Sequence, residues 1–315
     1  MRGRWSLAIA GLILILAGGL LAHLTQTSGG IRIQDVRFKG AKGNTMSALL
    51  YIPPNATPQI PAPAFSPSTA TSISRETQDG FAIEFARRGY VVLALDQTGH
   101  GYSDPPAFAN GFGGPDGLAH LRSLEFVDKN NIGLEGHSMG GWTVLAAATA
   151  MPNDYKSMVL EGRRPASRSP PTARRAGRAT WRWCSPSTRN SPTLMWGVEP
   201  PATSPRARNS GRCSARKAPV EPGKVYGDIA QGTARVLYTP AITHPAEHIS
   251  HEAIGYSLDW FAKTLQGGTP RPVDDQIWFR KEIGTLIALI GFVALLIGRL
   301  RRPAGSADVL APAAA

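Results

Sequence analysis

Five residues near the middle of the chain, Gly136-His137-Ser138-Met139-Gly140, have the spacing of a serine nucleophile held on a tight turn. The apolar residues 132–134 before them predict a strand, and the run from Gly141 predicts a helix. Glycines two residues on either side of the serine let strand and helix approach without Cβ clashes. The pattern predicts nucleophilic attack by Ser138 Oγ, with the Met139 backbone N–H directed at a developing oxyanion.

Strands and helices alternate around this turn. Alternation of apolar residues predicts two strands joined by a turn between residues 31 and 51. The continuous apolar run at 90–95 is typical of a strand buried on both faces of a parallel sheet, and 156–161 predicts another short strand. Helices are predicted at 75–88, 118–126 and 139–151. This order predicts an α/β fold with a mostly parallel sheet flanked by helices.

The chain resembles the α/β-hydrolase superfamily over residues 31–266. Besides the serine pentapeptide, residues 89–96 followed by Gly99-His100-Gly101-Tyr102-Ser103 resemble that family's fourth strand and the loop after it. Val236-Leu237-Tyr238, the following histidine loop and a helix at 250–265 resemble its last strand and last helix. The resemblance implies an α/β-hydrolase fold, hydrolysis of an ester or amide through an acyl-enzyme, a small-molecule acyl substrate and no cofactor or metal.

The resemblance implies that the catalytic base is a histidine after the last strand, and His244 has that place. His248 is the alternative base, whereas His251 falls at the start of a helix and is expected to be solvated. His137 and His100 are expected to form pocket wall or turn. In this family the acid precedes the base in the chain.

Five acidic residues lie between Ser138 and His244: Asp154, Glu161, Glu199, Glu221 and Asp228. Active-site groups in such folds sit at the carboxyl ends of strands. Of these acids only Glu161 ends a predicted strand, so it is the predicted acid.

Two segments depart from the family pattern. Residues 62–74, where the family has its third strand and the loop carrying the second oxyanion donor, are rich in Pro, Ala, Ser and Thr and predict a loop in place of that strand. Residues 163–218 hold twelve arginines and Lys217 against the single acid Glu199, which accounts for the whole net charge of +12. Both look like out-of-frame translation of a GC-rich gene. A disordered basic insertion is the alternative for the second segment.

The basic segment also raises nucleic-acid binding, because clustered arginines bind phosphates. No recognised nucleic-acid module accompanies it, and its tryptophans do not interleave in a stacking pattern, so we expect no nucleic-acid partner. Both cysteines, Cys184 and Cys213, lie in this segment and allow no conclusion on redox state. A catalytically disabled hydrolase scaffold is the alternative to an active enzyme.

Apolar segments at both ends predict membrane anchoring. Residues 5–24 are uncharged and follow Arg2 and Arg4, so they form a transmembrane anchor or a signal peptide. Residues 283–300 predict a second transmembrane helix, followed by a tail at 301–315. Arg2 and Arg4 precede the first apolar segment, and Arg301 and Arg302 follow the second. By the positive-inside rule these residues predict that both termini are cytoplasmic and that the hydrolase domain is extracytoplasmic.

Overall fold

The computed structural model describes residues 2–68, 74–162, 180–184 and 221–300. The chain divides into two compact units, residues 29–276 and the two terminal segments 1–28 and 277–315. The larger unit corresponds to the predicted hydrolase domain, and the smaller one contains the two predicted apolar helices. Each unit is described by itself.

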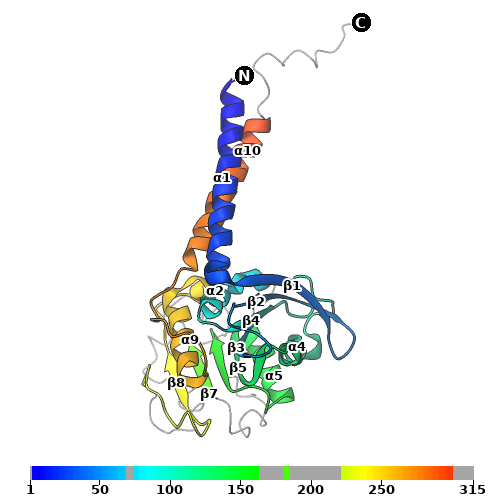
Figure 1. The fold of residues 1–315 in the computed structure, drawn as a ribbon, viewed down its shortest axis with the longest axis vertical. Helices are drawn as coiled ribbons and strands as arrows, with labels where there is room; N and C mark the ends of the chain where they lie inside the picture. The colour runs from blue at the N-terminus through cyan, green and yellow to red at the C-terminus, as the bar shows by residue number, and fades with distance from the viewer. Residues whose placement is uncertain (1, 69–73, 163–179, 185–220, 301–315) are drawn as a thin grey trace. The chain divides into compact units, whose positions relative to one another are not determined.

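The larger unit is built on an eight-stranded sheet in the order β1-β2-β4-β3-β5-β6-β7-β8 (Figure 1). Its strands are β1 (Arg32–Lys39), β2 (Thr45–Ile52), β3 (Ala62–Ser68), β4 (Val91–Leu95), β5 (Val127–His137), β6 (Ser157–Glu161), β7 (Thr180–Cys184) and β8 (Arg235–Tyr238). Only the β1–β2 and β2–β4 pairs are antiparallel; the pairs from β4 to β8 are parallel. The prediction of a mostly parallel sheet is therefore confirmed.

Helices flank the sheet and leave its strand ends free to carry loops (Figure 1). The helical segments of this unit are η1 (Ser28–Gly30), η2 (Arg75–Gln78), α2 (Asp79–Arg87), α3 (Ala109–Phe112), α4 (Gly114–Ser123), α5 (Gly140–Ala150), η4 (His244–Ile249) and α9 (His251–Thr264). Helix α4 packs against α5, and α2 packs against α9. The predicted helix at 118–126 starts four residues earlier and ends three residues earlier than expected, with Gly113 as its N-cap and Pro115 in its first turn.

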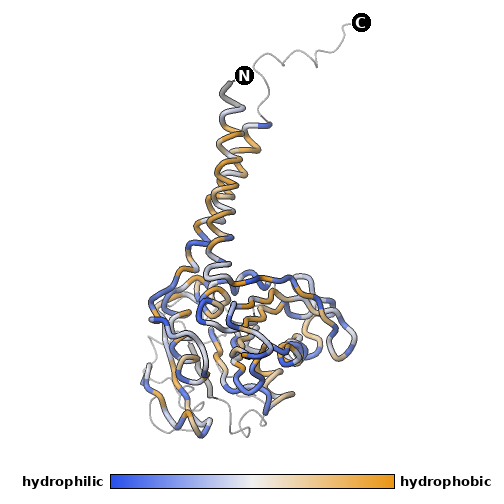
Figure 2. The backbone as a smooth tube through the Cα atoms, viewed as in Figure 1, coloured by the Kyte–Doolittle hydropathy of each residue, from blue (hydrophilic) through white to orange (hydrophobic). Residues whose placement is uncertain are grey.

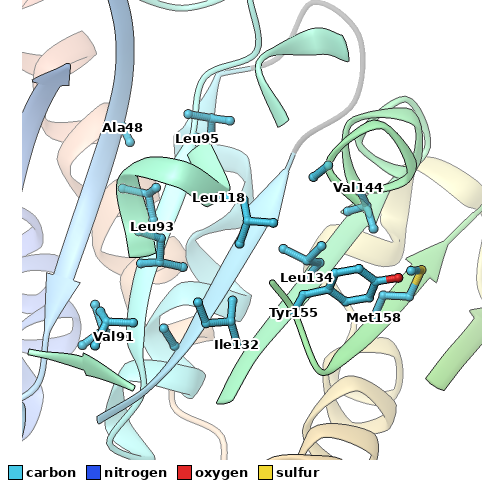
Figure 3. Packing of buried hydrophobic residues seen from close by; sticks show 14 of the residues in the cluster. Ala48, Val91, Leu93, Leu95, Leu118, Ile132, Leu134, Val144, Tyr155 and Met158 are labelled. Atoms are coloured by element: carbon cyan, nitrogen blue, oxygen red, sulfur yellow. The ribbon is translucent and has the colours of Figure 1, made fainter. Parts of the chain in front are cut away.

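The hydrophobic core lies between the sheet and helices α4 and α5. Figure 3 shows Leu93 of β4, Leu118 of α4, Leu134 of β5 and Val144 of α5 packed against one another. All of these side chains are at most 3% exposed. The core thus fixes β5 and α5, the two elements on either side of the serine.

The expectation that residues 62–68 form no strand is wrong. They form β3 in the centre of the sheet, between β4 and β5. Phe65 is fully buried and stacks on Phe85 of α2 with ring centroids 3.9 Å apart. Proline is tolerated in sheets at bulges, and the β3–β5 register shifts at Pro63. The free energy gained by burying the apolar side chains of β3 outweighs the hydrogen bonds that are lost because proline has no backbone N–H.

One stretch of the basic segment 163–218, residues 180–184, belongs to the sheet. These residues form β7, which pairs in parallel with β6 and with β8. The rest of that segment, the loop at 69–73 and the tail at 301–315 lie outside the described residues. The structure therefore does not test the frame-error hypothesis there.

The smaller unit consists of two long apolar helices, α1 (Arg2–Gln26) and α10 (Phe279–Leu300) (Figure 2). Both are long and apolar enough to cross a bilayer, which by itself is weak evidence of a membrane span. They pack antiparallel: the guanidinium of Arg299 lies 5.9 Å from the Trp5 ring at one end. At the other end, Gly18 meets Gly284.

Glycines form the contact between α1 and α10. A Cβ at Gly18 would lie 2.4 Å from the carbonyl oxygen of Gly284, and a Cβ at Gly11 would lie 2.5 Å from the amide nitrogen of Leu295. The neighbouring Gly19 has no atom within 4 Å of such a Cβ. Small residues that allow backbones to touch are typical of packed transmembrane helices.

Candidate active site

Ser138 stands on the turn between β5 and α5 in a left-handed backbone conformation, with φ +55°. Such a φ is uncommon for a residue with a Cβ and marks strain that the surroundings must hold in place. The Ser138 amide donates a hydrogen bond of 2.9 Å to the carbonyl oxygen of Glu161, which ties the turn to the end of β6. The prediction of a strained turn is confirmed.

The glycines of the pentapeptide make this turn possible. A Cβ at Gly136 would lie 2.3 Å from the carbonyl carbon of Gly140 and 2.6 Å from the amide nitrogen of Gly141. Real Cβ atoms do not approach backbone so closely, so a side chain at position 136 would force β5 and α5 apart. The close approach leaves Met139 at the N-cap of α5, beside the serine.

Two histidines and a glutamate gather around His137, the residue before Ser138: His244, Glu247 and His248. The His137 and His244 rings stack with centroids 4.5 Å apart, and the His248 ring lies 4.0 Å from that of His137. His137 Nε2 lies 2.9 Å from Glu247 Oε2 and 3.0 Å from the His244 carbonyl oxygen. Both partners can only accept, so Nε2 carries the proton.

The Glu247 carboxylate is the centre of this cluster. Its Oε2 lies 3.4 Å from His244 Nδ1, within ion-pair reach but beyond a normal hydrogen bond. Burial raises the pKa of Glu247, but its interactions with His137 and His244 outweigh this effect and the net shift is downward. Glu247 is therefore an ionised carboxylate next to the predicted base.

His248 has a different electrostatic setting. Burial, together with repulsion from His137 and His244, lowers its pKa to about 2. Neither of its ring nitrogens has a hydrogen-bond partner in the described part of the chain, although the residue is 8% exposed. His248 is therefore a neutral imidazole at working pH.

Gly162 brings the histidine loop to the end of β6. A Cβ at this residue, which has φ +60°, would lie 2.3 Å from His244 Cε1 and 2.4 Å from Glu247 Oε2. The η4 segment therefore lies directly against the carboxyl end of β6, next to the strand that leads into the serine turn.

The predicted acid, Glu161, lies at the carboxyl end of β6 and is fully buried. Its Oε1 accepts a hydrogen bond of 2.7 Å from Ser257 Oγ on α9. The carboxylate that the structure places within 4 Å of His244 Nδ1 is Glu247. Glu161 stays a prediction as the acid, and Glu247 becomes a second candidate.

Comparisons with known proteins bear on the fold of this chain. Residues 71–195, which include the serine turn, match the model of the serine aminopeptidase S33 family. An esterase from Pyrococcus furiosus is 15% identical, over 76% of this chain and 94% of the esterase, with a TM-score of 0.53. A predicted hydrolase from Thermoplasma acidophilum is 14% identical, over 74% of this chain and all of that one, with a TM-score of 0.51. These likenesses show that the chain has the α/β-hydrolase fold.

The likeness has limits in length and in sequence. An α/β hydrolase from a Penicillium species is 22% identical over 42% of this chain, with a TM-score of 0.35. The match covers 46% of that protein, so this chain spans less than half its length. No curated protein matches the chain.

The structure has Ser138 and Met139 on the turn between β5 and α5, and His244 at the start of η4 after β8, the positions that the sequence predicts. The sequence did not lead to Glu247 as a candidate, and for His137 it predicted only a place in the pocket wall or turn. The acid was expected before His244 in the chain because the α/β-hydrolase superfamily has its acid before its base, and Glu247 follows His244. The His244-x-x-Glu247 spacing within one short helical turn was the available signal. The expected place of the second oxyanion donor, after β3, lies outside the described residues.

Proposed function

We propose that this chain is a membrane-anchored serine hydrolase that cleaves an ester, or an amide, through an acyl-enzyme on Ser138. The observation that carries the proposal is the left-handed Ser138 on the turn between β5 and α5. His244, whose ring stacks on that of the preceding residue His137, has a carboxylate partner. A strained serine on such a turn is the arrangement that exposes a nucleophile at the top of the sheet. The ester class is proposed by analogy with the Pyrococcus furiosus esterase.

Each residue of the proposed mechanism has one role. Ser138 Oγ attacks the acyl carbon while His244 takes its proton and later returns it to the leaving group. The Met139 N–H stabilises the oxyanion at the N-terminus of α5. Glu247 orients His244 and stabilises the imidazolium that forms.

Fluorophosphonate labelling of membranes that contain the full chain tests the function. We expect one phosphonate adduct per chain, and mass spectrometry of the digested protein should place it on the peptide that contains Ser138. A folded chain that takes no label would show a disabled hydrolase scaffold and would overturn the proposal. Circular dichroism of the purified protein establishes that it is folded.

Substitution of Glu247 should distinguish the two candidate acids. We expect Glu247→Gln to lower kcat by about 10⁴-fold, the usual loss when the histidine of such a site loses its carboxylate. Glu161→Gln should change kcat little, because its amide oxygen can still accept from Ser257 Oγ. Steady-state ester hydrolysis is the measurement. A larger loss in Glu161→Gln would identify Glu161 as the acid, as the sequence predicts.

The membrane part of the proposal is that α1 is retained and pairs with α10 as a hairpin of two spans. The pair has Trp5 and Arg299 at one end, where the sequence also places Arg2 and Arg4. By the positive-inside rule this end is cytoplasmic, and the hydrolase unit is extracytoplasmic. A retained α1 requires that the purified protein keep its N-terminal residues.

Gly18→Leu should separate α1 from α10, whereas Gly19→Leu should not. A Cβ at position 18 would meet the Gly284 backbone at 2.4 Å, and position 19 faces open space. Spin labels at the exposed positions Leu12 and Leu296, with both native cysteines replaced by serine, report the distance between the helices. We expect the distance to grow only in Gly18→Leu. Equal distances in both variants would contradict the packing.

A further inference from the structure

Three potential metal ligands lie close together at the residue before Ser138 and in η4. They belong to His137, His244 and Glu247, each of which is buried and offers one ligand atom within 4.8 Å of the others. Glu247 Oε2 faces His137 Nε2 and His244 Nδ1. Two histidines and a glutamate form the ligand set of several zinc enzymes, with a water in the fourth position. The residues come from β5 and from η4, so no local sequence spacing announces them.

The separations suit a transition metal. Ligand atoms about 2.0–2.1 Å from a tetrahedral zinc lie roughly 3.4 Å from one another. Glu247 Oε2 lies 2.9 Å from His137 Nε2 and 3.4 Å from His244 Nδ1. A small opening of the cluster would therefore admit the ion at the point that the His137 proton now bridges.

The charges in the cluster also favour a bound metal cation. Glu247 is fully buried and ionised, and a buried carboxylate needs a cationic partner. His248 lies against His137 with no hydrogen-bond partner for either ring nitrogen among the described residues. A buried polar group without a partner is costly, and a metal-bound water would give His248 one.

We propose that His137, His244 and Glu247 form an inhibitory site for a divalent transition metal such as Zn²⁺. The ion takes the place of the proton on His137 Nε2, and that proton moves to Nδ1, so the imidazole stays neutral. Coordination through Nδ1 leaves the proton of His244 on Nε2. His244 then has no lone pair to accept the Ser138 proton, so the metal switches off the base. This consequence rests on the proposed function, whereas metal binding does not.

Zinc binding to the purified full chain tests the site without reference to activity. We expect one Zn²⁺ per chain in competition with a chromogenic chelator, and the same affinity in Ser138→Ala. Glu247→Gln and His137→Gln should each weaken binding at least tenfold, while His251→Ala, a control on the adjacent helix, should not. X-ray absorption should show histidine and carboxylate ligands at about 2.0–2.1 Å.

The outcomes separate the site from the function. No bound zinc, or equal affinity in wild type and Glu247→Gln with both shown to be folded by circular dichroism, overturns the metal site. If zinc binds as expected but leaves fluorophosphonate labelling of Ser138 unchanged, the ion does not silence His244 and the inhibitory role is overturned. If labelling falls with zinc and returns with chelator, the proposal stands.

Discussion

Replacing Ser138 with alanine should lower ester hydrolysis by about 10⁶-fold and abolish fluorophosphonate labelling. Loss of the nucleophile from a triad of this kind removes the covalent route, and what remains comes from binding and the oxyanion site alone. Alanine adopts the same φ of +55° at the same strain, so the turn should keep its shape. Rates should be measured on a chromogenic ester together with thermal unfolding.

Ser66→Ala is the matched control for that substitution. Ser66 is 6% exposed against 7% for Ser138, and its Oγ makes only a long contact of 3.5 Å with the Leu93 carbonyl oxygen on the neighbouring strand. The kcat of the Ser66→Ala variant should equal that of the wild type. Retention of more than about one hundredth of the activity in Ser138→Ala would show that another residue is the nucleophile.

The local pattern of the sequence was sufficient to predict most of the fold. The apolar run of β4, the pentapeptide and the small-residue helix α5 each carry their structure in a short stretch, because burial on both faces and a tight turn constrain residue types directly. The strain at Ser138 followed from the glycines on either side. These elements place the serine at the end of β5.

The sequence could not predict β3, because its stability comes from its neighbours. Residues 62–68 have two prolines and little apolar character, yet they lie between β4 and β5, and Phe65 stacks on Phe85. Tertiary burial overrides local propensity at such a position. A single sequence gives no sign of which segment a central gap in the sheet will take up.

The sequence also could not predict the contacts of His137. Its side chain reaches Glu247, which is 110 residues away in the chain, through the approach of η4 to the end of β6. That approach depends on Gly162, which has no side chain in the way. Long-range polar clusters of this kind arise from sheet order and loop paths, which no periodicity encodes.

His244→Ala should cost nearly as much as Ser138→Ala, about 10⁶-fold in kcat, because serine and histidine act as a unit. His248→Ala should stay within about tenfold of wild type. The difference follows from surroundings: His244 has Glu247 3.4 Å from Nδ1 to stabilise its charged form, whereas His248 is buried with a pKa of about 2. A group that stays neutral down to about pH 2 is too weak a base for a serine hydroxyl near pH 7.

The pH dependence of kcat/KM distinguishes loss of the base from a packing defect in the His244→Ala and His248→Ala variants. A base loses activity as pH falls through its own pKa, so the acid limb of kcat/KM belongs to whichever histidine accepts the proton. In His248→Ala that limb should keep its midpoint, since His248 titrates far below the working range. If His248→Ala instead removes the limb while His244→Ala leaves it in place, His248 is the base, and Glu247 serves only to hold His137 and His244 together.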